Sequence, residues 1–227
     1  MQQAQDHLRR SGKRMEALID RLGPCGLTFT DPTFGSLARS IVYQQISIRA
    51  ARSIHNRLLD TCGGMRNVTQ VSAPSVSPLD GAVGDAIPSS AVLTPEGILQ
   101  VTPEALRACG LSSQKVAYIT DLARKTADGH VEFERLPALS DDEVIAALTQ
   151  VKGIGVWTAQ MFLMFSLQRP DILPSADLGI RNAIKLLDRL KEAPTPAEVE
   201  RRGRKWRPYA SAASWYLWRS LEPTGPF

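Results

Sequence analysis

The sequence has little cysteine and little histidine. Its three cysteines are Cys25, Cys62 and Cys109, which stand far apart and form no Cys-x-x-Cys pair. Such spacing does not predict a disulfide framework, and three thiolates are too few to supply the four ligands of a typical iron–sulfur cluster. The three histidines, His7, His55 and His130, are dispersed and predict no cluster of metal ligands. We therefore expect no required cofactor and no catalytic metal.

Long hydrophobic runs are also missing. No stretch approaches the roughly 18 apolar residues of a membrane-spanning helix. The first residues, MQQAQDHLRRSGKR, lack the apolar core of a signal peptide. We expect a reducing, intracellular location: the cytoplasm, associated with the nucleoid if the source is bacterial, or the nucleus if the source is eukaryotic.

Neither sign of charge dominates, although basic residues exceed acidic ones. The chain has 27 Lys and Arg against 23 Asp and Glu, a formal net charge of +4. A mildly basic balance suits a polyanionic partner, but many basic proteins never bind nucleic acid. With 43% hydrophobic and 22% charged residues, the 227-residue chain is large enough for one large core or two small lobes.

Helix signals recur along most of the chain, and no comparable set of alternating strands appears. Asp31-Pro32 predicts a helix N-cap followed by a first-turn proline. A second helix is predicted from Ser47 to Gly63-Gly64. Further helix starts are predicted at Thr102-Pro103-Glu104, at Ser140 with Glu143, and at Thr195-Pro196-Ala197-Glu198. The sequence therefore predicts an all-α fold.

One segment breaks this pattern. Residues 65–97 are rich in Ser, Pro, Gly and Asp, a composition that predicts a long surface loop or insertion. At its end, Ala91–Leu93 and Ile98–Val101 flank the turn-like residues 94–97. We expect these two short runs to pair as a small hairpin, so that the insertion extends to about residue 100.

The most informative stretch is residues 148–159, LTQVKGIGVWTA. Gly153 and Gly155, on either side of Ile154, permit a tight turn between two helices. The second helix then begins with unpaired N–H groups, which bind phosphate readily. Lys152 adds a cation, and Ile154 would anchor the turn in the core. The alternative interpretation is an ordinary loop between packed helices.

A candidate acid follows in the segment 173–180, LPSADLGI. Asp177 stands where a new helix should begin, because Ile180, Ala183 and Ile184 are helix-spaced. Its simplest role is to cap that helix. A carboxylate at a helix N-terminus also stays ionised, so Asp177 is able to cap the helix and to act in catalysis.

The hairpin followed by a proline-rich turn and Asp177 resembles the helix-hairpin-helix DNA glycosylases. Two further strings, LARSIVYQQIS at 37–47 and WRPYASAASWYLW at 206–218, are similar to the alkylpurine branch, 3-methyladenine DNA glycosylase II. The resemblance covers residues 31–64 and 98–220. It implies one glycosylase unit of two helical lobes with a cleft between them.

The resemblance also implies which segments form each lobe. Lobe one is mainly residues 31–140, with the insertion 65–97. Lobe two comprises an N-terminal helix at 13–22 and residues 141–227, and it holds DNA at the hairpin 148–159 through Lys152, Gly153, Ile154 and Gly155. The expected partner is double-stranded DNA with alkylated bases, no membrane is involved, and the protein is expected to be a monomer.

The implied activity is that of a monofunctional DNA N-glycosylase in base excision repair. Such a hydrolase flips 3-methyladenine, 7-methylguanine and also ethenoadenine out of the duplex and cuts the N-glycosyl bond, with Asp177 as its catalytic carboxylate. One carboxylate suffices because a cationic alkylated purine leaves without protonation. Family members that also cut the strand carry a Schiff-base lysine two residues after the second hairpin glycine, where this chain has Trp157.

Several binding roles follow from the same resemblance. Gln45 would fill the space that the flipped base vacates, although a polar residue at a helix end is the alternative. Trp157 and Trp218 match aromatic positions that attract a cationic base, with core packing as the competing role. Met161 and Leu178 replace two further pocket aromatics, which implies a roomier or less selective pocket.

A structural cation is the last implied feature. In the family, hairpin carbonyls often hold a monovalent cation, Na⁺ or K⁺, that bridges to a DNA phosphate. By position these carbonyls belong to Thr149, Val151 and Ile154.

Three other functions remain open at this stage. A non-enzymatic helix-hairpin-helix module that binds DNA structure or lesions would keep Gly153 and Gly155 but would not need Asp177. A bifunctional glycosylase/lyase for oxidised bases is opposed by Trp157 and by the missing cysteine quartet. An all-α scaffold protein with no DNA role leaves the order of the motifs unexplained.

Overall fold

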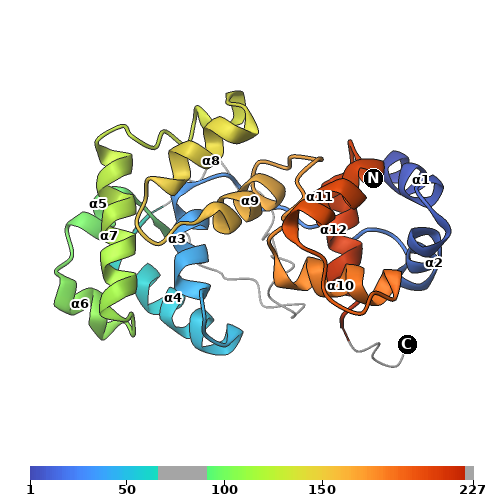
Figure 1. Cartoon of the computed structure of the whole chain (residues 1–227). Coiled ribbons are helices and arrows are strands. Elements are labelled where there is room, and N and C mark those ends of the chain that lie inside the picture. The colour runs from blue at the N-terminus through green and yellow to red at the C-terminus, as the bar shows by residue number, and fades with distance from the viewer. Residues whose placement is uncertain (66–90, 223–227) are drawn as a thin grey trace. The chain divides into compact units, whose positions relative to one another are not determined.

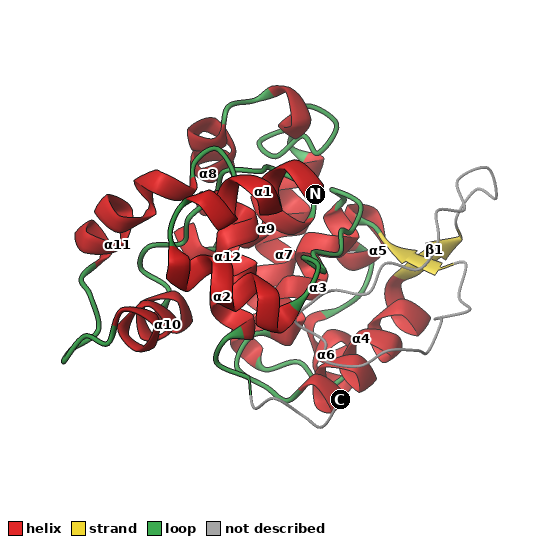
Figure 2. Cartoon of the chain, turned by 90° about the vertical axis from the view of Figure 1, so that its right-hand side faces the viewer, coloured by secondary structure: helices red, strands yellow, loops and turns green. Residues whose placement is uncertain are grey.

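The structure is a computed structural model that describes residues 1–65 and 91–222. In these residues twelve α-helices, two 3-10 helices and a single two-stranded sheet occur (Figures 1 and 2), which confirms the predicted all-α fold. Most of the predicted insertion, residues 66–90, lies outside the described residues. No helix within the described ranges is long and apolar enough to cross a membrane.

The contacts divide the chain into two compact units. Unit 1 comprises Met1–Leu27 and Gln168–Phe227, and unit 2 comprises Thr28–Leu167. The helices of unit 1 are α1 (Gln2–Arg10), α2 (Lys13–Leu22), α10 (Leu178–Asp188), α11 (Pro196–Gly203) and α12 (Ala210–Arg219).

Helix α12 is the centre of unit 1. All eight of its residues from Ala210 to Leu217 are buried, as expected of a helix that is covered on every side. It packs against α10, α2 and α1. Tyr216 lies fully inside, and its hydroxyl donates to the Gly23 carbonyl and accepts from the Gln5 side-chain amide, so the polar end of this core residue is satisfied.

The 3-10 helix Arg204–Trp206 also belongs to unit 1, and unit 2 contains the other seven α-helices, the 3-10 helix Leu136–Ala138 and the two-stranded sheet. Its helices are α3 (Phe34–Tyr43), α4 (Ile48–Cys62), α5 (Pro95–Leu99), α6 (Pro103–Ala108), α7 (Ser113–Ala127), α8 (Asp141–Thr149) and α9 (Val156–Phe165). Helix α7 packs against α3, α5 and α6, and α8 packs against α9. Ile119 and Leu122 of α7 have no exposed surface, so this helix supports the middle of the unit.

Most of the predicted helix starts are confirmed. Ser47, Thr102, Ser140 and Thr195 each accept a backbone N–H from three residues ahead. The prediction that Asp31 caps the first of these helices is wrong. Thr33 is the N-cap of α3 and forms a capping box with Ser36, because this pair satisfies two backbone donors reciprocally.

The predicted hairpin between residues 91–93 and 98–101 is also wrong. Strand β2 (Ala91–Leu93) does form, but its antiparallel partner is β1 (Gly63–Met65), which follows α4 directly (Figure 2). Residues 95–99 form α5 instead, because Thr94 caps the helix, Pro95 fits its first turn and Glu96 is acidic there.

The division into units differs from the predicted lobes in one segment. The helix at 13–22 does group with the C-terminal part of the chain, but residues 141–167 belong to unit 2. The reason is packing: Phe162 of α9 contacts the ring of Phe133 edge-on, and the Phe165 carbonyl accepts from the Thr30 amide. The hairpin is therefore built into unit 2.

Candidate nucleic-acid interface and carboxylate site

The predicted hairpin joins α8 to α9. Helix α8 ends at Thr149, and α9 begins at Val156 with Gly155 as its N-cap. Val151 and Ile154 are buried, whereas Lys152 between them is exposed. The burial of Ile154 anchors the turn as predicted, and it leaves the Lys152 ammonium on the surface.

The two hairpin glycines differ in what they require. Gly153 has φ +81°, and a Cβ there would stand 2.1 Å from Cδ2 of the Tyr118 ring. Only glycine fits such a position. Gly155 has φ −94° and nothing within 4 Å of an added Cβ. Its lack of a side chain leaves open space in front of the first turn of α9.

The start of α9 has donors for an anion. Gly155 offers no side-chain oxygen, so no side chain of the N-cap residue binds the N–H groups at the start of α9. An uncapped, exposed helix N-terminus is an anion-binding site by virtue of these donors and of the helix dipole. With Lys152 beside it, the turn has the chemistry of a phosphate-binding element.

Three long-range contacts hold this turn and the neighbouring Gln44. The Asp121 carboxylate accepts from the Lys152 amide at 2.9 Å, and the Gln44 side-chain amide donates to the Gly153 carbonyl at 3.1 Å. Lys115 Nζ donates to the Gln44 carbonyl at 2.7 Å. These partners lie far apart in the sequence, and no local pattern connects them.

Gln45 stands next to these contacts with an unusual backbone. Its φ is +58°, in the left-handed region that few residues other than glycine occupy. It is exposed and lies between the end of α3 and the cap of α4 at Ser47. A residue held in this conformation is often a functional one.

The two predicted pocket residues of α9 are in different environments. The Trp157 side chain is at the surface with 42% of its area exposed. Met161, one turn later, is only 7% exposed and belongs to the core. Of this pair, Trp157 is the more exposed residue.

Asp177 is the N-cap of α10. Its Oδ1 accepts from the Ile180 amide at 2.8 Å and from the indole Nε1 of Trp218 at 2.9 Å. The capping role considered for Asp177 is thus confirmed, and an indole donor is added to it. Leu178, the next residue, is 64% exposed, whereas Trp218 is half-buried.

Gly179 is a further residue that sequence analysis missed. A Cβ there would lie 3.0 Å from Oδ1 of Asp177 and 3.0 Å from Cδ1 of Trp218. Glycine at this position lets the carboxylate and the indole approach each other. The signal was present in the sequence as a glycine in the first turn of a helix, where it has no propensity advantage.

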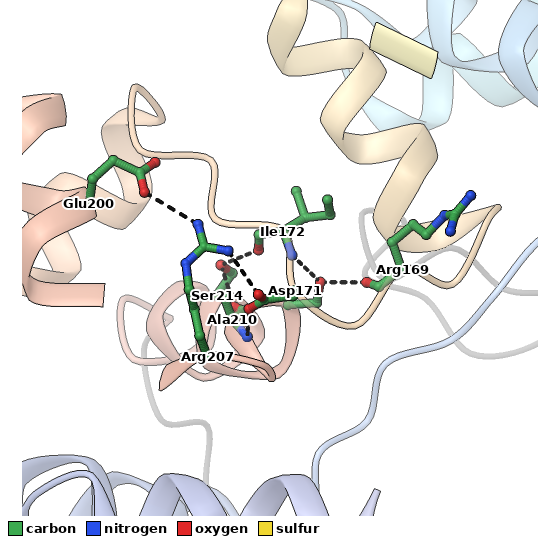
Figure 3. A network of polar contacts seen from close by, with 8 residues as sticks. Arg169, Asp171, Ile172, Glu200, Arg207, Ala210 and Ser214 are labelled. Carbon is green, nitrogen blue, oxygen red and sulfur yellow. Dashed lines mark hydrogen bonds and ion pairs between the residues drawn. The ribbon is translucent and has the colours of Figure 1, made fainter. Parts of the chain in front are cut away.

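A polar network holds the chain segment that precedes Asp177 (Figure 3). Asp171 accepts from the Ala210 amide at 3.2 Å and from Arg207 at 2.8 Å, so it caps α12 from outside that helix. Ser211 donates to the Arg169 carbonyl and accepts from the Ile172 amide. These bonds attach the segment to the helix that carries Trp218.

The donor set for a structural cation consists of backbone carbonyls. The Val151 carbonyl accepts one hydrogen bond, from the Ile154 amide at 3.1 Å, and a carbonyl oxygen has a second lone pair. Oxygen donors of this kind fit a hard cation. Within the described residues no group of three His, Cys, Asp or Glu side chains is placed to hold a metal ion.

The predicted site residues fall into two groups. Asp177, Leu178 and Trp218 come together in unit 1, and the carboxylate and the indole are in direct contact. Unit 2 contains Gln45, the hairpin 148–159, Trp157 and Met161. A helical protein with an uncapped helix-hairpin-helix turn and a carboxylate at a helix start has the features of a DNA-repair glycosylase fold.

The comparisons with known proteins agree with this class. Residues 38–208 match the HhH-GPD superfamily, described as base excision DNA repair proteins. Because the match spans more than half of the chain, the protein belongs to the HhH-GPD superfamily.

Individual relatives narrow the comparison. The chain is 33% identical over 209 residues to DNA-3-methyladenine glycosylase 1 of Schizosaccharomyces pombe, which covers 92% of this chain and 81% of that protein. A structure of Mag1 from the same yeast, in complex with abasic DNA, aligns with a TM-score of 0.76 at 31% identity over 98% of both chains. A DNA-3-methyladenine glycosidase of Bacillus halodurans aligns with a TM-score of 0.77 at 32% identity, over 96% of this chain and 88% of its own.

Proposed function

We propose that this protein is a monofunctional DNA N-glycosylase that removes alkylated purines from DNA, like the 3-methyladenine glycosylases to which it is similar. The observation that carries the proposal is the Asp177 carboxylate at the start of α10, held by the Ile180 amide and the Trp218 indole. The hairpin of unit 2, with an exposed cation beside an uncapped helix start, supports the DNA partner.

In this proposal Asp177 stabilises positive charge. Breaking the N-glycosyl bond of an alkylated purine leaves an oxocarbenium-like sugar, which a nearby carboxylate stabilises until water adds. Two donors on Oδ1 fix the orientation of the carboxylate before reaction. A leaving 3-methyladenine or 7-methylguanine already carries a positive charge, so no second acid is required for these bases.

The same assignment predicts hydrolysis without strand cleavage. The position two residues after Gly155 holds Trp157 rather than a lysine, so no amine is available there for a Schiff base. We propose instead that Trp157 offers its exposed face to a cationic base. We propose that Trp218 acts mainly by orienting the carboxylate and not by contacting the base, because its indole N–H donates to Asp177.

We propose that unit 2 binds DNA through the hairpin and Gln45. Lys152 and the first N–H groups of α9 receive a phosphate, and Gln45 fills the space left in the base stack. The carbonyls of Thr149, Val151 and Ile154 would hold Na⁺ or K⁺ as a structural bridge to DNA. No step of the chemistry depends on that ion.

We propose a substrate range of the type II enzymes: 3-methyladenine, 7-methylguanine and, more slowly, ethenoadenine. Leu178 is aliphatic and 64% exposed, so it can contact the base without the preference for cationic bases that an aromatic ring would give. A monomer with no required cofactor suffices for this reaction.

Release of free base from methylated duplex DNA tests the proposal. The purified protein, in buffer with EDTA, should release methylated purines and leave strands that break only on alkaline treatment. Tight binding of the same DNA without release would support the alternative, a non-catalytic helix-hairpin-helix module. Strand breaks without alkali would indicate a lyase.

A further inference from the structure

Helix α7 contacts the two loops of unit 2 that we propose bind DNA, the hairpin and the turn that contains Gln45. Lys115, Tyr118 and Asp121 are spaced at three residues and therefore lie along one side of the helix. Tyr118 packs against Gly153, and Asp121 accepts from the Lys152 amide. Lys115 reaches the other loop, at the end of α3. One face of one helix thus touches the hairpin and the turn that contains Gln45.

The Lys115 ammonium hydrogen-bonds two carbonyl groups at the end of α3. Its Nζ donates to the Val42 and Gln44 carbonyls, each at 2.7 Å. Terminal carbonyls of a helix have no intrahelical donor, and a cation there also complements the helix dipole. Burial partly desolvates the ammonium and lowers the pKa of Lys115, and the two short hydrogen bonds compensate for the lost water.

These bonds fix the residue that precedes Gln45. Gln45 adopts φ +58°, a conformation that a non-glycine residue keeps only when its surroundings impose it. On one side Lys115 holds the Gln44 carbonyl, and on the other Ser47 caps α4. The backbone of Gln45 is therefore constrained from both directions.

The Gln44 side chain connects the held turn to the hairpin. Its amide Nε2 donates to the Gly153 carbonyl at 3.1 Å, so the main chain of Gln44 is held by Lys115 while its side chain holds the hairpin. The phosphate-binding turn and the Gln45 turn are linked through one residue.

We infer that Lys115 is a positioning residue for DNA distortion: it holds Gln45 in the left-handed conformation needed for insertion into the base stack, and it joins this turn to the hairpin through Gln44. The inference rests on the proposed function, because it assumes that Gln45 inserts into DNA. Lys115 itself does not touch the substrate.

Lys115→Met tests the inference, because methionine retains most of the length of the side chain and removes the donors. The probe is a pair of duplexes, one with a tetrahydrofuran abasic site and one undamaged, and the measured quantity is the ratio of their dissociation constants. We expect the preference for the abasic duplex to fall about tenfold. Lys125→Met, the same substitution later on α7, is the control and should leave the ratio unchanged.

A double-mutant comparison separates positioning from general loss of structure. Gln45→Ala alone should reduce the preference, and adding Lys115→Met to it should cause no further loss, because Lys115 acts through Gln45. Independent losses that multiply would overturn the inference, as would a normal preference in Lys115→Met. If Lys115→Met fails to fold, Lys115→Gln takes its place in the same cycle.

The wild-type protein distinguishes this inference from the proposed function. If the wild type releases methylated purines but shows no preference for the abasic duplex, the insertion role of Gln45 and the inference both fall, whereas the proposed activity stands; if it releases none, the proposed function falls. If the wild type prefers the abasic duplex and Lys115→Met shows the same ratio, only the role of Lys115 is overturned.

Discussion

The indole N–H of Trp218 donates a hydrogen bond of 2.9 Å to Oδ1 of Asp177. The same oxygen accepts from the Ile180 amide, so the carboxylate is oriented by one helix start and one side chain from α12. Gly179 makes the approach possible, because a side chain there would crowd both groups. The half-buried Trp218 thus helps to orient the Asp177 carboxylate through a direct hydrogen bond.

Trp218→Phe should slow base release while leaving DNA binding intact. Phenylalanine keeps an aromatic ring but loses the donor, and a hydrogen bond to a charged group is worth about 1.5 kcal/mol or more, roughly a tenfold rate effect. Single-turnover release from methylated DNA measures it. Trp215→Phe, on the same helix, is the matched control; equal rates for wild type and Trp218→Phe would refute the positioning role.

Gly153→Ala should weaken binding to all DNA sequences alike. The added Cβ would meet the Tyr118 ring at 2.1 Å, at a φ of +81°, so the hairpin must distort. Gly155→Ala is the matched variant. The fold should tolerate it, because nothing lies within 4 Å of the new Cβ. A loss of DNA binding in this variant would therefore mean that the methyl group obstructs a bound phosphate. Thermal unfolding and titration of several duplexes distinguish the two effects. A binding loss confined to particular sequences contradicts the assignment.

Lys152→Ala should reduce the salt dependence of DNA binding. Each phosphate contact contributes about one unit to the slope of log K against log salt concentration. Lys152 is exposed at the hairpin, and its removal should lower the slope by about one unit at every sequence tested. Lys125→Ala removes the same charge elsewhere in unit 2 and should leave the slope unchanged. An unaltered slope in Lys152→Ala would place the phosphate contact elsewhere.

The substrate range follows from which aromatic faces are available. Trp157 is exposed, whereas Met161 is buried and Leu178 is aliphatic. Each cation–π contact that is absent costs on the order of 1 kcal/mol, less than tenfold in rate, so the proposed function predicts that cationic lesions are still excised. Rates on oligonucleotides with one defined lesion should show excision of 3-methyladenine and 7-methylguanine, with slower release of ethenoadenine. Strict confinement to 3-methyladenine would show a tighter pocket.

Local features of the fold were predictable from the sequence. Capping residues such as Ser140 and Thr195, and the start of α10 at Asp177, follow from short-range chemistry, and the structure has helices there. One local prediction failed, because Thr33 rather than Asp31 caps α3, and another failed because the partner was distant in the sequence. Ala91–Leu93 was expected to pair with the next apolar run, but it pairs with residues 63–65.

The candidate site was predictable only in part, for the same reason. Asp177 and the hairpin glycines are visible as local signals. The Trp218 indole, which meets Asp177 across 41 residues, and Lys115, which meets Val42 across 73, depend on how helices pack. Burial also changed the interpretation of Met161, whose spacing on α9 does not reveal which side of the helix faces the core.

Asp177→Asn tests the central claim most directly. Asparagine caps a helix as well as aspartate does, and its oxygen accepts the same two bonds, so the variant should fold and should bind abasic DNA as the wild type does. Only the negative charge is lost. Single-turnover release of methylated purines should then fall by several orders of magnitude. Near-normal release by a folded, DNA-binding Asp177→Asn protein would contradict the account.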